Sequence, residues 1–301
     1  MTRWEIDQPR ELTFDPVRSV HVTVVSGNVN VVGADGPVRL EVTRITAPPL
    51  VVEQEGEELL VAYRDWPWRG VFDWVGKDFQ DWSWKDALGK LARLFHARYQ
   101  ADVTLAVPYD STVKVNLLSG PVVLSDLAGE VSARTMSGTL TLQSLAGRVD
   151  AEVVSGDIEA ESVAGDLRAS VMSGSVVAAG CLSRRVDARA TSGDITLDLA
   201  NPHIESVAAT TVSGEVIVRI PRDACLEVSA TAVSGKLAST FEELRAERGP
   251  GQSTLSGRIG SVPPGRGVPG RLSIGITSGH GSILRSDQPC HGAKPPRRTC
   301  D

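Results

Sequence analysis

The chain has 301 residues, of which 41% are hydrophobic and 23% charged, a balance typical of a globular protein with a substantial core. Its formal net charge of −6 argues against a nucleic-acid binder that relies on overall positive charge. No apolar stretch approaches the roughly 20 residues of a membrane-spanning helix. Residues 1–7 contain no apolar signal core, so we expect a cytoplasmic protein.

Residues 1–63 are predicted to form N-terminal β-strands that join a larger repeat region. They contain, at Ser26, one early copy of a Ser-Gly dipeptide that recurs later in the chain. Glycine suits a tight corner because it adopts positive φ angles, and serine can bond to the adjacent backbone. A nucleophilic serine would need a histidine partner, and no histidine recurs beside these dipeptides. We therefore interpret every Ser-Gly pair as a structural corner.

Residues 64–99 form a tryptophan-rich segment with helical apolar spacing over residues 85–98. Five of the six tryptophans lie here, namely Trp66, Trp68, Trp74, Trp82 and Trp84. Three interpretations stay open: the segment caps the exposed end of a repeat fold, binds a protein partner, or contacts a membrane surface. If the chain has a dedicated partner-binding site, we expect these tryptophans to form it.

Residues 100–288 carry a repeat with a period near twenty residues. After Ser26, the serines of the Ser-Gly pairs are Ser119, Ser137, Ser155, Ser173, Ser192, Ser213, Ser234, Ser256 and Ser278. Their spacing is 18 residues over the first four copies and 19 to 22 residues afterwards. A second turn signal, Ala-Gly, follows three of the early copies by nine residues. A fixed period of this length is typical of a solenoid.

Between the glycines, apolar and polar residues alternate, which predicts strands of about five residues with one buried face. Aligned at 18 residues, one column reads Val113, Val131, Val149 and Leu167. We predict an all-β fold: a single β-solenoid (β-helix) with coils of about 18–22 residues, Ser-Gly corners and one partly helical tryptophan-rich insertion. Each coil is expected to pair with the next. Residues 241–248 are expected to form one or two helical turns, and residues 289–301 a flexible tail.

The cysteine pattern predicts neither a metal site nor a cofactor. The four cysteines are Cys181, Cys225, Cys290 and Cys300. They are too few for a disulfide framework and lack the paired spacing of a zinc site, and we expect Cys181 and Cys225 to be buried. Asp157 and Asp194 directly follow Ser-Gly pairs, but the glycine-rich calcium-binding repeat is absent. We therefore expect no calcium site.

One stretch of the sequence combines a proline at a strand end, alternation of apolar and polar residues, and a Ser-Gly pair. It runs from Val107-Pro108-Tyr109-Asp110 to Ser119-Gly120 and carries a family resemblance. The chain resembles the bacterial β-strand-repeat family of unknown function, whose members are often labelled as candidate adhesins. The resemblance covers residues 20–62 and 100–286, implies a Ser-Gly repeat β-solenoid, and brings no catalytic motif with it.

These observations lead us to expect a non-enzymatic protein that acts as a rigid interaction scaffold for a protein partner. The first alternative is a structural protein that self-assembles through the ends of its solenoid. The second is a polysaccharide-active β-helix enzyme that uses Glu152, Glu159 or Glu161, although these glutamates are explained more simply as a solvated surface. Contact with a membrane surface through residues 64–99 is a weaker possibility, and we expect no nucleic-acid partner.

Overall fold

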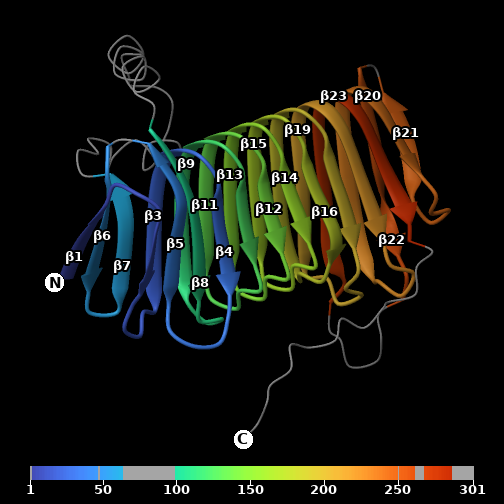
Figure 1. The fold of residues 1–301 in the computed structure, drawn as a ribbon. Helices are drawn as coiled ribbons and strands as arrows, with labels where there is room; N and C mark the ends of the chain where they lie inside the picture. Colours follow the sequence, from blue (N-terminus) through green and yellow to red (C-terminus); the bar gives the residue numbers. More distant parts are fainter. Residues whose placement is uncertain (1, 47, 64–98, 250, 262–267, 287–301) are drawn as a thin grey trace, which may run out of the picture. The chain divides into compact units, whose positions relative to one another are not determined.

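The computed structural model describes residues 2–46, 48–63, 99–249, 251–261 and 268–286 (Figure 1). These residues form 23 β-strands and no helix, which confirms the predicted all-β class. The tryptophan-rich residues 64–98, with their predicted helix, and residues 287–301 lie outside the described residues. Two compact units divide the chain, residues 1–157 (unit 1) and residues 158–301 (unit 2).

Unit 1 contains two ladders of hydrogen-bonded strands. In spatial order the first ladder consists of β1 (Thr2–Ile6), β6 (Leu50–Glu55), β7 (Glu58–Tyr63), β3 (Ser19–Ser26), β9 (Thr112–Ser119), β11 (Val131–Ser137) and β13 (Val149–Ser155). The second consists of β2 (Arg10–Thr13), β5 (Arg39–Thr46), β8 (Gln100–Val107), β4 (Val29–Gly33), β10 (Val122–Ser125) and β12 (Leu140–Gln143). Pairing is parallel from β7 to β13 and from β8 to β12, and antiparallel in the strands before them.

Each regular coil of unit 1 follows the first ladder, turns at a Ser-Gly corner and continues in the second ladder. Val113 pairs in register with Val131, and Val131 with Val149, which confirms the predicted 18-residue column. All three side chains are buried, as the alternation of apolar and polar residues predicts. The early Ser26 pairs with Ser119, so the coil of β3 and β4 lies directly beside the coil of β9 and β10.

The N-terminal strands of unit 1 cover part of its core. Trp4 of β1 contacts Phe14 edge to face, with ring centroids 5.1 Å apart, and Phe14 and Ile6 are buried. Edge-to-face packing of this kind adds to the stabilisation from apolar burial. Strands from the N-terminal region thus protect apolar side chains at this end of unit 1.

Unit 2 also contains two ladders. The first consists of β15 (Leu167–Ser173), β17 (Arg185–Ser192), β19 (Ser206–Ile220), β23 (Gly270–Arg285), β20 (Leu226–Ser239), β22 (Gln252–Ile259) and β21 (Arg245–Gly249). The second consists of β14 (Ile158–Glu161), β16 (Val176–Cys181), β18 (Ile195–Leu199) and the C-terminal halves of β19, β23 and β20. Coil-like parallel pairing therefore extends through most of unit 2, which supports a β-solenoid-like fold.

Three details of unit 2 differ from the prediction. The coils do not all pair in sequence order, because β23 lies between β19 and β20. Ser256 is not a corner: it lies within β22, which runs antiparallel to β20 and pairs Ser256 with Ser229. Residues 241–248 form no helical turns, since a turn closed by the Leu244 N–H and the Phe241 carbonyl leads directly into β21. Cys181 and Cys225 are buried, as predicted.

The Ser-Gly corners stack so closely that only glycine fits. Gly138 has a φ of +136°, and a Cβ atom at this position would overlap the carbonyl oxygen of Gly120 in the neighbouring coil. The Gly138 N–H donates to the Ser155 carbonyl at 3.1 Å, so the corners are also hydrogen-bonded to each other. The opposite corner uses a left-handed residue in two coils of unit 1, Asp126 at +55° and Ser144 at +53°.

Candidate functional site

The structure does not place the tryptophans predicted to bind a partner. Trp66, Trp68, Trp74, Trp82 and Trp84 all lie outside the described residues. Tyr63, which precedes this segment, contacts Tyr99, its last residue: their rings meet edge to face, with centroids 5.2 Å apart. Burial, with a smaller contribution from Tyr99, raises the pKa of Tyr63 above its ordinary value. The segment therefore begins and ends at one place on unit 1.

The described residues contain a second candidate surface, in unit 2. It is formed by the residues that directly precede five Ser-Gly corners, and we call it the corner row: Met172, Thr191, Val212, Thr277 and Val233. The serines that follow them pair in this spatial order, from β15 through β17, β19 and β23 to β20. Neighbouring members of the corner row are therefore about 4.8 Å apart, the spacing of paired strands.

The corner row points away from the core. The residue before each member is buried, and side chains on consecutive strand residues face opposite sides. The side chains of Met172, Val212 and Val233 are accordingly 40%, 49% and 53% exposed. At the equivalent position in unit 1, Val25 and Leu118 are only 4% and 6% exposed. Met136 and Val154, at the same position in unit 1, are half-buried, so this position is most exposed in the five members of unit 2.

The geometry of the corner row favours binding over chemistry. Its five side chains are thioether, methyl and hydroxyl groups, and none of them titrates near neutral pH. Its backbone is held by bonds between adjacent corners, such as the Gly174 N–H to the Ser192 carbonyl at 3.0 Å and the Gly193 N–H to the Ser213 carbonyl at 2.8 Å. A partner therefore meets an apolar strip whose shape is already fixed, which lowers the entropic cost of association.

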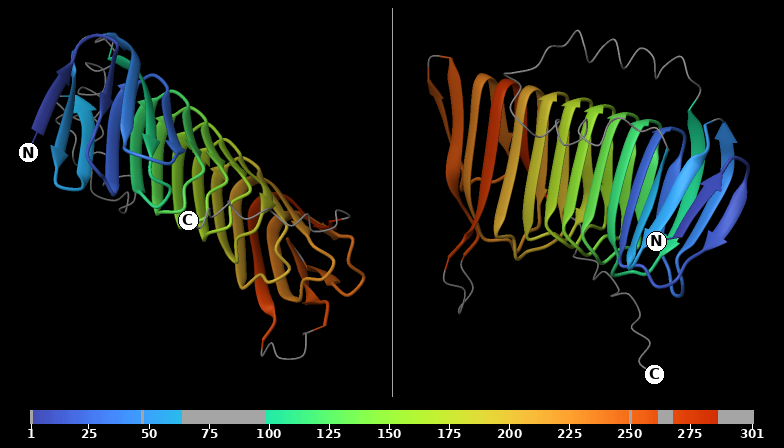
Figure 2. Two further views of the ribbon diagram at one scale, coloured as in Figure 1. Left: turned by 60° about the horizontal axis from the view of Figure 1, so that its bottom comes forward. Right: turned by 90° about the vertical axis from the view of Figure 1, so that its left-hand side faces the viewer.

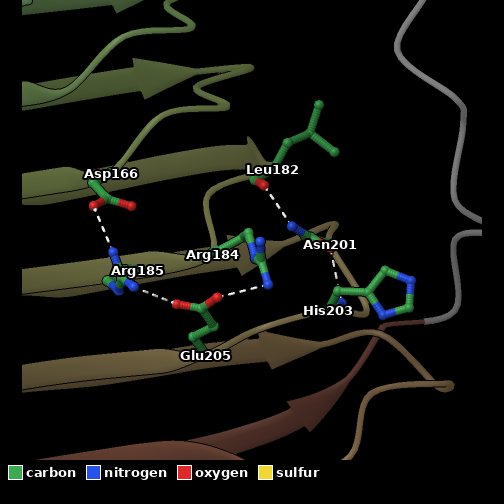
Figure 3. Close-up of polar contacts among 7 residues, drawn as sticks. All are labelled: Asp166, Leu182, Arg184, Arg185, Asn201, His203 and Glu205. Atoms are coloured by element: carbon green, nitrogen blue, oxygen red, sulfur yellow. Dashed lines mark hydrogen bonds and ion pairs between the residues drawn. The ribbon is translucent and has the colours of Figure 1, made fainter. Parts of the chain in front are cut away.

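A polar cluster lies on the turns of unit 2 (Figure 3). Two guanidinium groups share one carboxylate: Arg184 Nη2 lies 2.6 Å from Glu205 Oε1, and Arg185 Nη2 lies 2.7 Å from Glu205 Oε2. Arg185 Nη1 also reaches Asp166 Oδ2 at 3.3 Å. The cluster thus joins the turns that precede β15, β17 and β19.

Amide and backbone bonds hold the same turns together. Asn201 Nδ2 donates to the Leu182 carbonyl at 2.7 Å, and the His203 N–H donates to Asn201 Oδ1 at 2.8 Å. Because the arginines are 60% and 62% exposed, each ion pair contributes only about 0–1 kcal/mol. We interpret the cluster as a set of contacts between coils. Charges of opposite sign that recur before successive strands are the sequence signal that indicates it.

Two of the acidic residues considered for chemistry make structural contacts, and two others are exposed. Glu152 Oε2 lies 3.1 Å from Arg134 Nε, and the two residues are register partners on β13 and β11. Asp194 Oδ1 accepts the Glu215 N–H of the next coil at 2.7 Å. Glu159 and Glu161 are exposed on β14. Among the described residues, no three His, Cys, Asp or Glu side chains are arranged to hold a metal ion.

A shallow hollow of about 500 Å³ is lined by Thr240, Glu242, Glu243 and Arg285. The guanidinium of Arg285 lies over the ring of Phe241, 4.8 Å from its centroid, which fixes one wall of the hollow. The Thr240 hydroxyl in its lining accepts the Arg285 N–H at 2.9 Å, a structural contact. Within the described part of the chain, no helix has both the length and the apolar character to cross a membrane.

Comparison with solved structures identifies three similar chains at low sequence identity. A candidate cell adhesion protein from Clostridium sporogenes is 10% identical, with a TM-score of 0.24 over 93% of this chain and 100% of that one. A candidate adhesin from Bacteroides fragilis is 12% identical, with a TM-score of 0.38 over 92% and 96%. A candidate lipid binding protein from Parabacteroides distasonis is 12% identical, with a TM-score of 0.31 over 93% and 97%. No curated protein matches the chain.

The family comparison covers more than half of the sequence. The model of the Toastrack DUF4097 family matches residues 89–261, which include β8 to β22 of the two units. This match confirms the resemblance, noted from the Ser-Gly repeat, to a β-strand-repeat family of unknown function. The chain belongs to the Toastrack DUF4097 family.

Proposed function

We propose that the chain is a non-enzymatic interaction scaffold that binds a protein partner through the corner row of unit 2. The observation that carries this proposal is the exposure of Met172, Val212 and Val233 at one repeated position of a rigid ladder. Full burial of a side chain of this size contributes about 1.5–3 kcal/mol, so covering three half-exposed ones contributes roughly 2–4 kcal/mol. A polar rim of serine hydroxyls lies beside the row, as protein interfaces require.

Two features favour a scaffold over end-to-end assembly. β21 is exposed along its whole length and pairs only with β22 among the described strands, yet its sequence, Arg-Ala-Glu-Arg-Gly, is charged. At the start of unit 1, β1 carries an ion pair between Arg3 and Glu53 of β6, 3.3 Å apart. Charged side chains on edge strands oppose the pairing of one edge with another. A scaffold is also favoured over a polysaccharide-active enzyme, because Glu152 is engaged by Arg134.

Capture from a host lysate, repeated with matched variants, tests the proposal. The first variant carries Val212→Asp and Val233→Asp. Its control carries Val177→Asp, since Val177 is 40% exposed but lies on β16, outside the corner row. We expect a protein that is captured by the native chain and by the control, and lost from the corner-row variant while circular dichroism shows it folded.

A third variant separates the two candidate surfaces. It changes Trp66, Trp68, Trp74, Trp82 and Trp84 to Ser. If the same partner is lost from this variant and retained by the folded Val212→Asp/Val233→Asp variant, the tryptophan segment binds the partner and the corner row does not. Retention of every captured protein by the corner-row variant contradicts the proposal.

A further inference from the structure

β23, the last strand of the described residues, lies inside unit 2 and not at its edge. β23 occupies the position between β19 and β20 in the ladders (Figure 2). It pairs in parallel with β19 from Arg271 to Arg285 and with β20 from Gly270 to Ile283. Both edges of β23 are therefore used along nearly its whole length, and its side chains Leu272, Ile274, Ile276 and Ile283 are buried.

The strands beyond β23 depend on it for their place in the fold. Among the described strands, β20 pairs only with β23 and β22, and β21 pairs only with β22. No backbone ladder joins β19 to β20. The block of β20, β22 and β21 is thus attached to β19 by β23 and by the chain connection over residues 221–225. Without β23, the core-facing apolar rows of β19 and β20 would be left without the strand that separates them.

The connection to β23 is much longer than its path requires. Ile259 and Gly270 are both register partners of Leu226, on its two sides, so they lie only about two strand spacings, or roughly 10 Å, apart. Residues 260–269 join them, and ten residues in extended form span about 35 Å. The tether therefore has length to spare for β23 to reach a position outside its own chain.

We propose that the slot between β19 and β20 accepts β23 from a second copy of this chain, giving a strand-exchanged dimer. The slot and the strand are identical in both copies, so every ladder bond and apolar contact is the same within one chain and between two. The difference in free energy is limited to the tether and to the entropy of association, and a high protein concentration offsets the latter. In the exchanged dimer the corner row keeps its order, with Thr277 supplied by the second copy, so this proposal does not rest on the proposed function.

Exchange takes place while the slot is open. β23 begins about 50 residues after β19 ends, and contacts between segments this far apart form late in folding. Until then, β19 and β20 present unpaired edges to any matching strand. Once formed, the dimer persists on dilution, because releasing β23 requires the separation of two parallel ladders.

A disulfide across the slot tests the proposal in the full chain. Thr210 and Gly275 are register partners on β19 and β23, and a Cβ on Gly275 would lie 3.5 Å from Thr210 Cγ2, an ordinary contact. Thr210→Cys and Gly275→Cys are introduced together with Cys290→Ser and Cys300→Ser, which removes the tail thiols. The protein is refolded over about a hundredfold range of concentration, oxidised, and separated under denaturing, non-reducing conditions. We expect covalent dimers whose fraction rises with concentration.

The matched control is Arg189→Cys with Thr210→Cys in the same background. These residues are register partners on β17 and β19 and do not involve β23. We expect this pair to link within one chain at every concentration, so a dimer in this control would measure non-specific oxidation. If the Thr210/Gly275 pair also links only within one chain at every concentration, the proposal is wrong.

A measurement on the unmodified chain covers the case in which the cysteine variants do not fold. The native sequence is refolded at the highest concentration, diluted, and its mass measured by light scattering. A dimer that persists on dilution, and converts to monomer only after unfolding and refolding at low concentration, supports exchange. A monomer at every concentration overturns it. Neither result bears on capture of a partner by the corner row.

Discussion

Replacement of a corner glycine is expected to destabilise the chain far more than replacement of an exposed turn glycine. In Gly138→Ala the new methyl group overlaps the Gly120 carbonyl oxygen, and the φ of +136° is strained for any residue with a Cβ. The conformational strain costs about 1–3 kcal/mol. Displacement of the corner weakens the bonds from the Gly138 N–H to Ser155 and from the Gly120 N–H to Ser137, each contributing about 1 kcal/mol. The expected total is about 3–5 kcal/mol.

Gly56→Ala is the matched control in the same unit. Gly56 has a φ of +59°, and nothing lies within 4 Å of a Cβ placed there. Its replacement measures the cost of a left-handed conformation alone, about 1–2 kcal/mol. Urea unfolding followed by circular dichroism gives both free energies. If Gly138→Ala loses no more stability than Gly56→Ala, close stacking of the corners does not constrain this fold and the reasoning is refuted.

Three further predictions concern other parts of the chain. Ser144→Gly relieves a left-handed φ of +53° and should raise the unfolding free energy by up to about 1 kcal/mol, whereas Ser144→Val should lower it; thermal unfolding of both variants checks this. Glu205→Ala removes two exposed ion pairs and should cost no more than about 1–2 kcal/mol, with a smaller loss in concentrated salt; urea titrations at low and high salt measure the difference. Burial raises the pKa of Tyr63 above the unfolded value of about 10, so the folded chain holds this proton more tightly and stability must fall as pH rises past that value. Tyr63→Phe should reduce this alkaline loss in urea titrations on either side of that pH, and an equal loss in both proteins would contradict the assignment.

The coil could be predicted from sequence because its constraints are local and repeated. A glycine at each corner and alternation between corners specify where a strand begins, where it ends and which face is buried. Val113, Val131 and Val149 therefore align in one column of the sequence, and they pair in register. The same constraints place Ser26 in the ladder beside Ser119, across an insertion of different composition.

The order of the later strands could not be predicted in this way. Ser213, Ser234 and Ser278 stand in equivalent contexts, so a local pattern does not say which strand neighbours which. Long-range packing decides that β23 lies between β19 and β20. At Ser256 the local pattern predicts a corner that the structure does not have. Its Ser-Gly pair matches the repeat, but Ser256 pairs with Ser229 in an antiparallel ladder. Tertiary pairing overrides local pattern where several strands carry the same signal.

The corner row could not be predicted from sequence, because the residue before a Ser-Gly pair is buried in some coils and exposed in others. Val25 and Leu118 occupy this position in unit 1 and are buried, whereas Val212 and Val233 occupy it in unit 2 and are exposed. Sequence alternation gives the direction of a side chain and not what covers it. The polar cluster around Glu205 could not be predicted for a related reason, since Asp166, the Arg184-Arg185 pair and Glu205 lie about 20 residues apart and each is typical of a solvated turn.

The corner position itself gives the strongest argument that the apolar residues of unit 2 serve a purpose beyond folding. Thr191 and Thr277 occupy the same exposed position, so the ladder accepts a polar side chain there without losing its register. Met172, Val212 and Val233 are 40%, 49% and 53% exposed, so they place more apolar surface in contact with water than threonine does. Folding alone therefore does not require them, whereas association with an apolar partner surface does.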